Sequence, residues 1–328
     1  MIAFDNVSKT FTGGVKAVRN LTLEVAEGET LVLLGTSGSG KTTTMKMVNR
    51  LIEPSAGTIS IDGQNIMETN PIDLRRGIGY SIQHIGLFPH MTVGGNIHIV
   101  PNLLGWTEDR IAERIDELLK LVGLKPEDFV DRYPNQLSGG QQQRVGVARA
   151  LAADPPIILM DEPFGALDPI TRDQLQNEFL ALESVIRKTI IFVTHDVFEA
   201  VKMGDRIAIL DQGELQQLGT PREIVEQPAN EFVDDFLGQQ RFQLSLLTQT
   251  VESMVEPAVA GQEVKETKRG EYLQASMPLL SALDAFKRYG RRRLRVYKDD
   301  RLAGHLTKDT LLAKITEVMS TLERETDA

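Results

Sequence analysis

The sequence predicts an α/β protein: a mixed, mostly parallel sheet with a helical subdomain, followed by a small second α/β unit. Three observations support this prediction. Short apolar runs alternate with segments of helical periodicity, a glycine-rich loop joins one run to a helix, and Pro155-Pro156 precedes a second alternating series. Strands and helices that alternate along a chain form parallel sheets with helices packed on their faces.

The first part of the chain is rich in short β-branched runs, and Gly13-Gly14 marks a turn between the first two. The segment 30–34 is apolar almost throughout, so we expect a buried strand that leads into the glycine-rich loop. The expected strands lie at residues 2–7, 21–25, 30–34, 58–61 and 77–82, with a helix at 41–51.

The middle of the chain changes to a helical pattern. Ile111, Ile115, Leu118, Leu119 and Val122 recur at spacings of three and four residues, which places them on one apolar helix face. We therefore expect a helical subdomain at about residues 87–153. The later elements are strands at 157–160, 189–193 and 206–210, and helices at 171–186 and 197–202.

The composition is that of an ordinary globular protein. The 328 residues suit one large and one smaller domain, which we place at 1–237 and 238–328. No cysteine is present, which excludes disulfides and thiolate metal sites. The net charge of −10 argues against nucleic-acid binding. The start of the chain shows no secretory signal and no apolar run approaches the roughly 20 residues of a membrane span, so a transport function requires other chains for the membrane path.

The glycine-rich loop has the form Gly-x4-Gly-Lys-Thr between a strand and a helix, which is typical of phosphate-binding loops. Its glycines let successive N–H groups face phosphate oxygens, and the helix that follows adds its positive dipole end. Lys41 can bridge the β- and γ-phosphates of ATP, and the Thr42 hydroxyl can ligate Mg²⁺. The predicted nucleotide contacts are Gly35, Ser37, Gly38, Ser39, Gly40, Lys41, Thr42 and Thr43.

Two carboxylates follow the apolar run 157–160, at the strand end where open α/β sheets bind ligands. Asp161 suits a Mg²⁺ role, and Glu162 suits general-base catalysis on the attacking water. His195 follows another strand and can contact the γ-phosphate. The amide of Gln83, at a third strand end, can reach Mg²⁺ and the water. The alternatives are solvated strand ends and a structural histidine.

Phe11 precedes the phosphate loop in the sequence. Its ring can stack on adenine, a contact that contributes about 1–3 kcal/mol. The alternative is a simple core aromatic.

A further motif carries a family resemblance. Leu137-Ser138-Gly139-Gly140-Gln141, followed by Gln142-Gln143-Arg144, resembles the signature of ATP-binding-cassette (ABC) ATPases, and together with the other motifs the resemblance covers about residues 1–237. It implies a head-to-tail homodimer in which Ser138, Gly139, Gly140 and Gln141 complete the ATP site of the other subunit. It also places Asp168 at the dimer seam. By the same resemblance Phe11 is at the adenine-stacking position, Gln83 at the lid position and His195 at the switch position.

Within this family, residues 86–93, 103–106, 132–161 and 164–172 look like those of glycine betaine, choline and related osmoprotectant importers. The resemblance implies an ATPase subunit, bound peripherally to the cytoplasmic face of the bacterial inner membrane. Its partners would be two permease subunits and, indirectly, an extracytoplasmic substrate-binding protein. Gly94-Gly95 departs from the pattern and should weaken a helix that begins there by about 1–2 kcal/mol.

Other function classes remain open at this point. An importer of methionine or another amino acid is the alternative within the family. A cassette ATPase of DNA repair or translation would need a long insertion or a second cassette, but only 119 residues separate Lys41 from Asp161. A regulatory nucleotide-binding module without turnover is disfavoured by Glu162 and His195.

The last part of the chain predicts a helix at 278–286, strands at 294–297 and 302–306, and a final helix capped by Thr307. This pattern resembles a cystathionine-β-synthase-type (CBS) regulatory repeat, with Thr310 where the family usually has a ribose-holding aspartate. One repeat implies pairing across the homodimer. The unit also contains a basic cluster, Lys287, Arg288, Arg291, Arg292, Arg293 and Arg295. This cluster is either a solvated face or a contact surface for lipid headgroups or phosphate.

Overall fold

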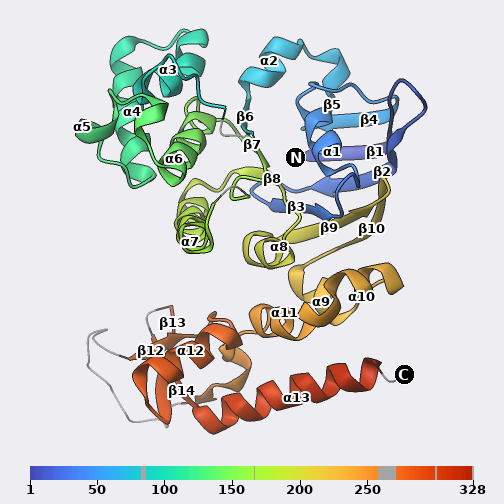
Figure 1. The fold of residues 1–328 in the computed structure, drawn as a ribbon, viewed down its shortest axis with the longest axis vertical. Helices are drawn as coiled ribbons and strands as arrows, with labels where there is room; N and C mark the ends of the chain where they lie inside the picture. Colours follow the sequence, from blue (N-terminus) through green and yellow to red (C-terminus); the bar gives the residue numbers. More distant parts are fainter. Residues whose placement is uncertain (83–85, 166, 258–270, 300, 327–328) are drawn as a thin grey trace. The chain divides into compact units, whose positions relative to one another are not determined.

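The computed structural model describes residues 1–82, 86–165, 167–257, 271–299 and 301–326, the last five of these by backbone alone. The chain divides into two compact units, Met1–Thr220 and Pro221–Ala328, each with its own sheet and helices (Figure 1). Among the described residues, no helix has both the length and the apolar character needed to cross a bilayer.

A six-stranded sheet forms the centre of the first unit, in the order β10-β9-β3-β8-β7-β6. Every neighbouring pair is parallel except β9 with β10. All residues of β3, β7 and β8 are buried, as their apolar sequences predict. The strands are β3 (Thr30–Gly35), β6 (Ile78–Ser81), β7 (Ile157–Asp161), β8 (Thr189–Val193), β9 (Arg206–Asp211) and β10 (Glu214–Gly219).

A second, antiparallel sheet has the order β2-β1-β4-β5. The apolar core joins it to helix α1 and the main sheet, with Leu21 and Ile59 in the same cluster as Met45, Leu31 and Leu159. Sequence periodicity did not separate these two sheets. The elements are β1 (Ile2–Thr10), β2 (Lys16–Val25), α1 (Lys41–Val48), β4 (Ala56–Ile61), β5 (Gln64–Asn65), η1 (Ile66–Glu68) and α2 (Pro71–Arg76).

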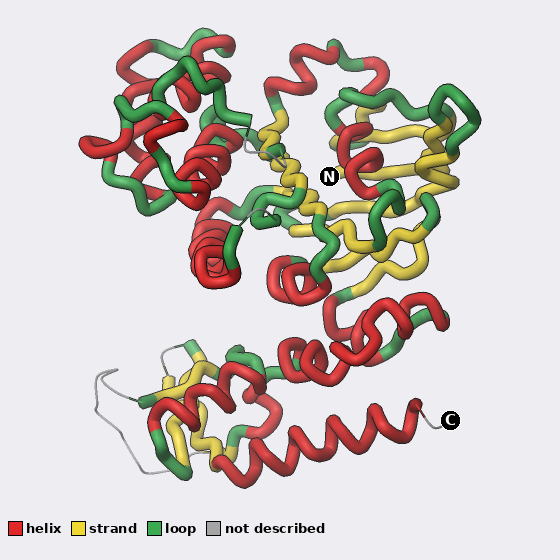
Figure 2. The backbone as a smooth tube through the Cα atoms, viewed as in Figure 1, coloured by secondary structure: helices red, strands yellow, loops and turns green. Residues whose placement is uncertain are grey.

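The region predicted as a helical subdomain is helical, and Figure 2 shows these helices gathered beside the sheets of the first unit. Ile111, Leu118 and Leu119 are buried on one face of α4, in agreement with the apolar period. Two further helices, α7 and α8, follow strands of the main sheet. The helices are α3 (Val93–Leu103), α4 (Glu108–Leu121), α5 (Pro126–Phe129), η2 (Pro134–Gln136), α6 (Gly139–Ala150), α7 (Pro169–Ile186) and α8 (Val197–Met203).

The glycine pair at 94–95 lies in the first turn of α3. Thr92 caps this helix, because its hydroxyl accepts a hydrogen bond from the Gly95 amide at 3.1 Å. A Cβ at position 94 would lie 2.8 Å from Val130 Cγ2. Glycine therefore allows α3 to approach Val130 closely, which gives the departure from the family pattern a packing reason.

The second unit packs helices on a four-stranded sheet of order β11-β14-β13-β12. Leu273, Leu279, Phe286, Val296 and Leu306 form its core. The predicted helix, strand pair and Thr307 cap are all present. The elements are α9 (Pro221–Glu226), α10 (Glu231–Leu237), η3 (Gly238–Gln240), α11 (Arg241–Thr248), η4 (Val251–Met254), β11 (Glu256–Pro257), β12 (Tyr272–Gln274), α12 (Leu279–Tyr289), β13 (Arg293–Lys298), β14 (Arg301–Thr307) and α13 (Lys308–Thr326).

The division between the units falls before α9, whereas the sequence led us to place it at 237/238. Arg241 explains the difference. Its guanidinium donates to the carbonyl of Val225 at 2.8 Å and pairs with Asp234 at 3.0 Å. Helices α9 and α10 are thus bonded to α11 and belong with the residues that follow them.

The basic cluster of the second unit is exposed at all six positions. Acidic residues lie beside this cluster: Arg291 donates to Glu271 at 2.6 Å, and Arg293 lies 3.9 Å from Glu256. Carboxylates therefore offset part of its charge, as on a solvated, ion-paired face.

Candidate functional site

The phosphate loop lies between strand β3 and helix α1, and two of its glycines are required by close contacts. Gly35 and Gly40 have φ values of 149° and 101°. A Cβ would lie 2.0 Å from the Leu210 carbonyl oxygen at position 35, and 2.3 Å from the Ala17 carbonyl oxygen at position 40. No other residue fits these positions without moving the backbone of a neighbouring segment.

Lys41 places a positive charge inside this loop. Its ammonium donates to the carbonyl oxygens of Gly35 at 2.8 Å and Thr36 at 2.7 Å. Burial lowers the pKa of Lys41, and the nearby carboxylates Glu162 and Asp161 oppose that shift. A buried ammonium at the start of a helix that follows a glycine-rich loop suits a polyanion.

The loop borders a cavity of about 490 Å³. Glu162 and His195 lie on the same cavity, so the structure brings together three of the motifs that are far apart in the sequence. The lining residues are Ala17, Ser37, Gly38, Ser39, Gly40, Lys41, Thr42, Thr43, Glu162 and His195.

Thr42 and Asp161 form a pair of oxygen donors beside this cavity. The Thr42 hydroxyl donates to Asp161 Oδ1 at 3.0 Å. Burial is the main cause that raises the pKa of Asp161, and the Thr42 hydrogen bond and Lys46 act against it. Mg²⁺ takes hard oxygen ligands and is commonly held by one or two protein groups plus phosphates and water. The two oxygen donors therefore fit Mg²⁺ bound together with phosphate and water. A metal site made by protein side chains alone is not found, because the described part of the chain has no cluster of three His, Asp or Glu that could hold a metal.

Glu162 and His195 meet because β7 and β8 are parallel neighbours. The register pairs Asp161 with Val193, and the Glu162 amide donates to the Val193 carbonyl at 2.9 Å. His195 Nδ1 lies 3.2 Å from Glu162 Oε1. Glu162 has a φ of 45°, a conformation that non-glycine residues seldom adopt and that is enriched at functional sites.

The signature motif starts a helix elsewhere in the first unit. Ser138 Oγ accepts from the Gln141 amide at 3.3 Å, and Gln141 Oε1 accepts from the Ser138 amide at 3.0 Å, which is a capping box at the start of α6. Ser138 and Gly139 are exposed. Among the described residues, the lining of the phosphate-loop cavity includes none of Ser138, Gly139, Gly140 and Gln141.

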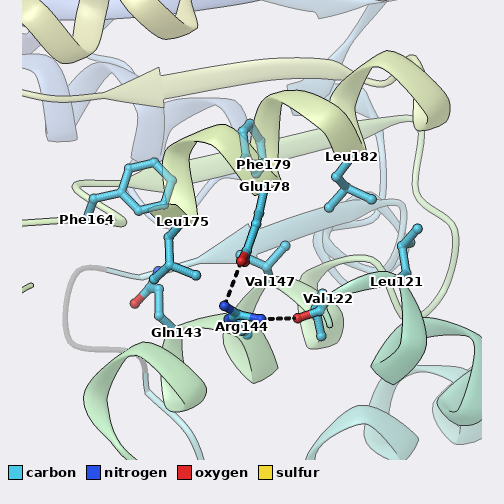
Figure 3. A pocket seen from close by; sticks show the side chains of 10 residues that line it. All are labelled: Leu121, Val122, Gln143, Arg144, Val147, Phe164, Leu175, Glu178, Phe179 and Leu182. Carbon is cyan, nitrogen blue, oxygen red and sulfur yellow. Dashed lines mark hydrogen bonds and ion pairs between the residues drawn. The ribbon is translucent and has the colours of Figure 1, made fainter. Parts of the chain in front are cut away.

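Helix α6 contacts α7 around Arg144. Arg144 donates to Glu178 of α7 at 2.8 Å and to the Val122 carbonyl at 3.0 Å (Figure 3). Apolar side chains, including Leu175 and Phe179 of α7, line the small cavity around this pair (Figure 3). The signature helix and α7 are therefore joined by an ion pair and by apolar packing.

Asp168 caps the start of α7. Its Oδ1 accepts from the Thr171 amide at 3.1 Å, and hydrogen bonding with Thr171 is the main cause that lowers the pKa of this exposed carboxyl. Phe11 lies in the turn between β1 and β2 and is 39% exposed, so it is not a core aromatic. The Lys9 ammonium lies 5.3 Å from the centre of its ring. Gln83 lies outside the described residues.

Several residues near the site carried no signal in the sequence. Asp211 Oδ1 accepts from the Thr36 hydroxyl at 3.1 Å, which ties the loop to the end of β9. Tyr80 of β6 lies near Asp161, and burial followed by that carboxylate raises the pKa of Tyr80 to about 12. Only the pairing of strands brings these side chains to the site, and no local pattern encodes that pairing.

Known proteins resemble this chain over most of its length. The ABC transporter family matches residues 18–165 of the chain. The glycine betaine uptake system ATP-binding protein YehX of Escherichia coli is 48% identical over 287 residues, which cover 87% of this chain and 90% of YehX. The chain belongs to the ABC transporter family. The choline transport ATP-binding protein OpuBA of Bacillus subtilis is 63% identical to this ABC chain over 241 residues, which are 74% of this chain.

The ABC chain spans only part of some relatives, since the match covers 63% of OpuBA and 60% of the Listeria monocytogenes carnitine transport ATP-binding protein OpuCA. Solved structures share its fold. The dimeric ATP-binding cassette MJ0796 bound to ADP and Pi is 35% identical, with a TM-score of 0.61 over 67% of this chain and 98% of that one. CbiO1 of Clostridium perfringens is 26% identical, with a TM-score of 0.64 over 70% and 91%. The predicted fold class of the first unit is confirmed.

Proposed function

We propose that this chain is the ATP-hydrolysing subunit of an importer for glycine betaine, choline and related quaternary ammonium osmoprotectants. One observation supports this most: a single cavity joins the phosphate loop to Glu162 and His195. The chain also resembles ATP-binding proteins named for choline and glycine betaine transport. No feature of the structure favours the alternative, an importer of methionine or another amino acid.

In this proposal the loop N–H groups and Lys41 bind the phosphates of ATP, and Phe11 stacks on adenine. Glu162 takes a proton from the attacking water, and His195, 3.2 Å from that carboxylate, orients the water against the γ-phosphate. Mg²⁺, when bound, would be held by Thr42 and Asp161 and would neutralise phosphate charge. Gln83 stays a candidate ligand on the sequence alone.

We place the signature of a second copy against the phosphates. Ser138 and Gly139 are exposed at the start of a helix, where an anion is favoured. They do not line their own chain's cavity in the described structure, so a two-fold arrangement would supply them from the partner. Asp168 and the exposed Ile170 at the start of α7 would then lie at the seam.

The permease subunits would bind a groove of about 370 Å³ in the first unit, between β6, α2, α3 and α6. Ile78, Ile82, Phe88 and Ile99 give it apolar walls, with arginines at its edge. The groove includes Ile82 and residues of α3, so in this proposal the helical segment after Gln83 passes movement at the ATP site to the bound permease. This arrangement puts the chain on the cytoplasmic face of the inner membrane, with the extracytoplasmic substrate-binding protein as an indirect partner.

We also keep the proposal that the second unit is a CBS-like regulatory domain that pairs across the homodimer. Its support is the order strand, helix, strand, strand, helix from β12 to α13 around one apolar core. Thr310 stands where the family usually has a ribose-holding aspartate. Its hydroxyl is hydrogen-bonded to that of Thr307, with the two oxygens 2.7 Å apart.

Reconstitution tests the function and the substrate together. The chain and its permease would be placed in liposomes that enclose ATP, with the substrate-binding protein outside, and uptake of labelled choline, glycine betaine and methionine would be measured. We expect uptake of the quaternary amines only, and none with the Lys41→Ala chain. Uptake of methionine without choline would favour the amino-acid importer, and no ATP-dependent uptake would overturn the transport proposal.

A further inference from the structure

Asn96 is a buried polar residue of α3 that has no part in the proposed ATP site. Its side chain is 0% exposed, although asparagine is a poor helix former and is usually found at the surface. It follows Gly94-Gly95, so three residues of low helix propensity stand in succession near the start of α3. The contact with Val130 explains a glycine at 94, but it does not explain a buried amide at 96.

The hydrogen bonds of the Asn96 side chain all go to the main chain of the segment 88–92, which precedes α3. Its Oδ1 accepts from the Phe88 amide at 2.8 Å. Its Nδ2 donates to the carbonyl oxygens of Phe88 at 3.2 Å, Met91 at 3.2 Å and Thr92 at 2.9 Å. Both polar ends of the amide are therefore satisfied. Because a buried amide without partners is costly, these bonds favour one conformation of the segment.

Two further hydrogen bonds hold the same stretch of chain. Arg149 of α6 donates from Nη1 to the Gly86 carbonyl at 2.6 Å. The Met91 amide donates to the Phe88 carbonyl at 3.1 Å, which closes a turn. Residues 86–92 are thus bonded to α6 at one end and to α3 at the other.

The outer side of this segment carries exposed rings. Phe88 is 44% exposed, and Pro89 and His90 are exposed as well. The Phe88 and His90 rings meet edge to face, with centroids 6.0 Å apart and planes at 67°. Phe88 also lines the groove of about 370 Å³ to which we assigned the permease. Aromatic side chains on a backbone that is already fixed lose little freedom when a partner binds.

We propose that Asn96 is a positioning residue for permease binding, because it holds the main chain of residues 88–92 and so fixes the place of Phe88 and His90. In the described structure Asn96 lines neither the groove nor the phosphate-loop cavity, so it acts through this segment. The inference rests on the importer function proposed above, in which the groove receives the permease. It adds a residue that shapes the docking surface from inside the unit.

Hydrogen–deuterium exchange of the full chain tests whether Asn96 holds the segment. Asn96→Ala removes all four side-chain hydrogen bonds, so amides in the peptide 87–95 should exchange about tenfold faster or more. Exchange in α4 should not change. Asn102→Ala is the matched control, because it alters an exposed asparagine of the same helix.

Permease binding tests the functional part. The affinity of the full chain for its permease in nanodiscs should fall about tenfold or more in Asn96→Ala, with the ATP affinity of the chain alone changed less than about twofold. Phe88→Ala removes the ring but keeps the main-chain groups that Asn96 binds, so it should weaken binding without faster exchange. In the variant that combines both changes, the loss should be smaller than the product of the single losses, because both changes act on one contact.

The outcomes separate this inference from the importer function. Unchanged exchange in Asn96→Ala, faster exchange with unchanged permease affinity, or fully multiplicative losses in the combined variant would each overturn it. If Asn96→Ala fails to fold, as judged by thermal melting, Asn96→Ser, which keeps a smaller hydrogen-bonding group, decides by the same measurements. Failure of the unchanged chain to bind the permease would instead overturn the importer function, while the exchange result would still show whether Asn96 holds the segment.

Discussion

The phosphate loop and the signature differ in how each is held. The loop is fixed against its own chain: the glycines at 35 and 40 lie close to neighbouring backbone, and Lys41, Glu162 and His195 share its cavity. The signature is exposed, and its capping box satisfies the helix start from within its own turn. In the proposed function, the first region binds the phosphates of ATP and the second offers a helix start to the ATP of a partner copy. A single chain would then hold only half of the catalytic site.

The largest effect should come from Glu162→Gln. The variant keeps the size of the side chain but cannot accept a proton, so ATP hydrolysis should fall at least about a hundredfold. ATP binding should persist, because Lys41 and the loop are untouched. Steady-state hydrolysis and nucleotide titration would measure both, with Glu214→Gln as a control at an exposed ion pair. Near-normal turnover would remove Glu162 as the base.

The variant Gly139→Asp should impair dimerisation while leaving ATP binding by the monomer almost unchanged. An aspartate in the variant Gly139→Asp places a negative charge at an exposed helix start, where it would repel the phosphates of the partner's ATP. Dimerisation of the Glu162→Gln chain with ATP should be lost, with at least about tenfold slower hydrolysis in the otherwise unchanged chain. Light scattering measures the dimer. Monomer ATP affinity should stay within about twofold, and a large loss there would contradict the division between the regions.

Lys41→Ala should act on the first region alone. Removing the ammonium takes away its attraction for phosphate and leaves the carbonyls of Gly35 and Thr36 without this donor. We expect ATP affinity to fall about tenfold or more, which isothermal titration would measure. Lys46→Ala, in the same helix, is the comparison. Equal losses in both variants would mean that general positive charge, not the loop geometry, binds the nucleotide.

The smallest effect concerns Glu199, a buried carboxyl of α8. Burial raises the pKa of Glu199 above its usual 4.5, so the ionised carboxyl is less stable in the folded chain than in the unfolded one. This penalty is full above the folded-state pKa and disappears as the pH falls below 4.5. The Tm of the unchanged chain should therefore rise relative to that of Glu199→Gln on acidification. A stability difference of 1 kcal/mol corresponds to about 2–4 °C in a unit of this size. A difference in Tm that does not change with pH would contradict the burial of the charge.

The sequence predicted the local features of the fold well. Most strands and helices of the first unit follow from apolar period and turn residues, although α2, β5 and β10 were not predicted. The phosphate loop and Asp161-Glu162 follow from residue types at fixed spacing. The parallel order of β7 and β8, which joins Glu162 to His195, follows from alternation of strands and helices. These features depend on neighbours in the chain, where periodicity is informative.

What the sequence did not predict depends on distant contacts. The separate antiparallel sheet, the bond from Thr36 to Asp211 and the Gln176–Glu199 pair join residues that share no local pattern. The boundary before α9 rests on Arg241, whose role is visible only once its partners Val225 and Asp234 are in place. Pairing between remote segments is decided by packing of the whole unit.

The bonds of Lys41 to its own loop have a consequence for the exit of products. Two of its three N–H groups already rest on carbonyl oxygens of residues 35 and 36, with Ser39 Oγ at 3.4 Å from the same nitrogen. In the proposed function, these contacts would keep the ammonium hydrogen-bonded after phosphate leaves, so that no unpaired buried charge remains. Release of phosphate would then cost less free energy, which favours repeated cycles of hydrolysis.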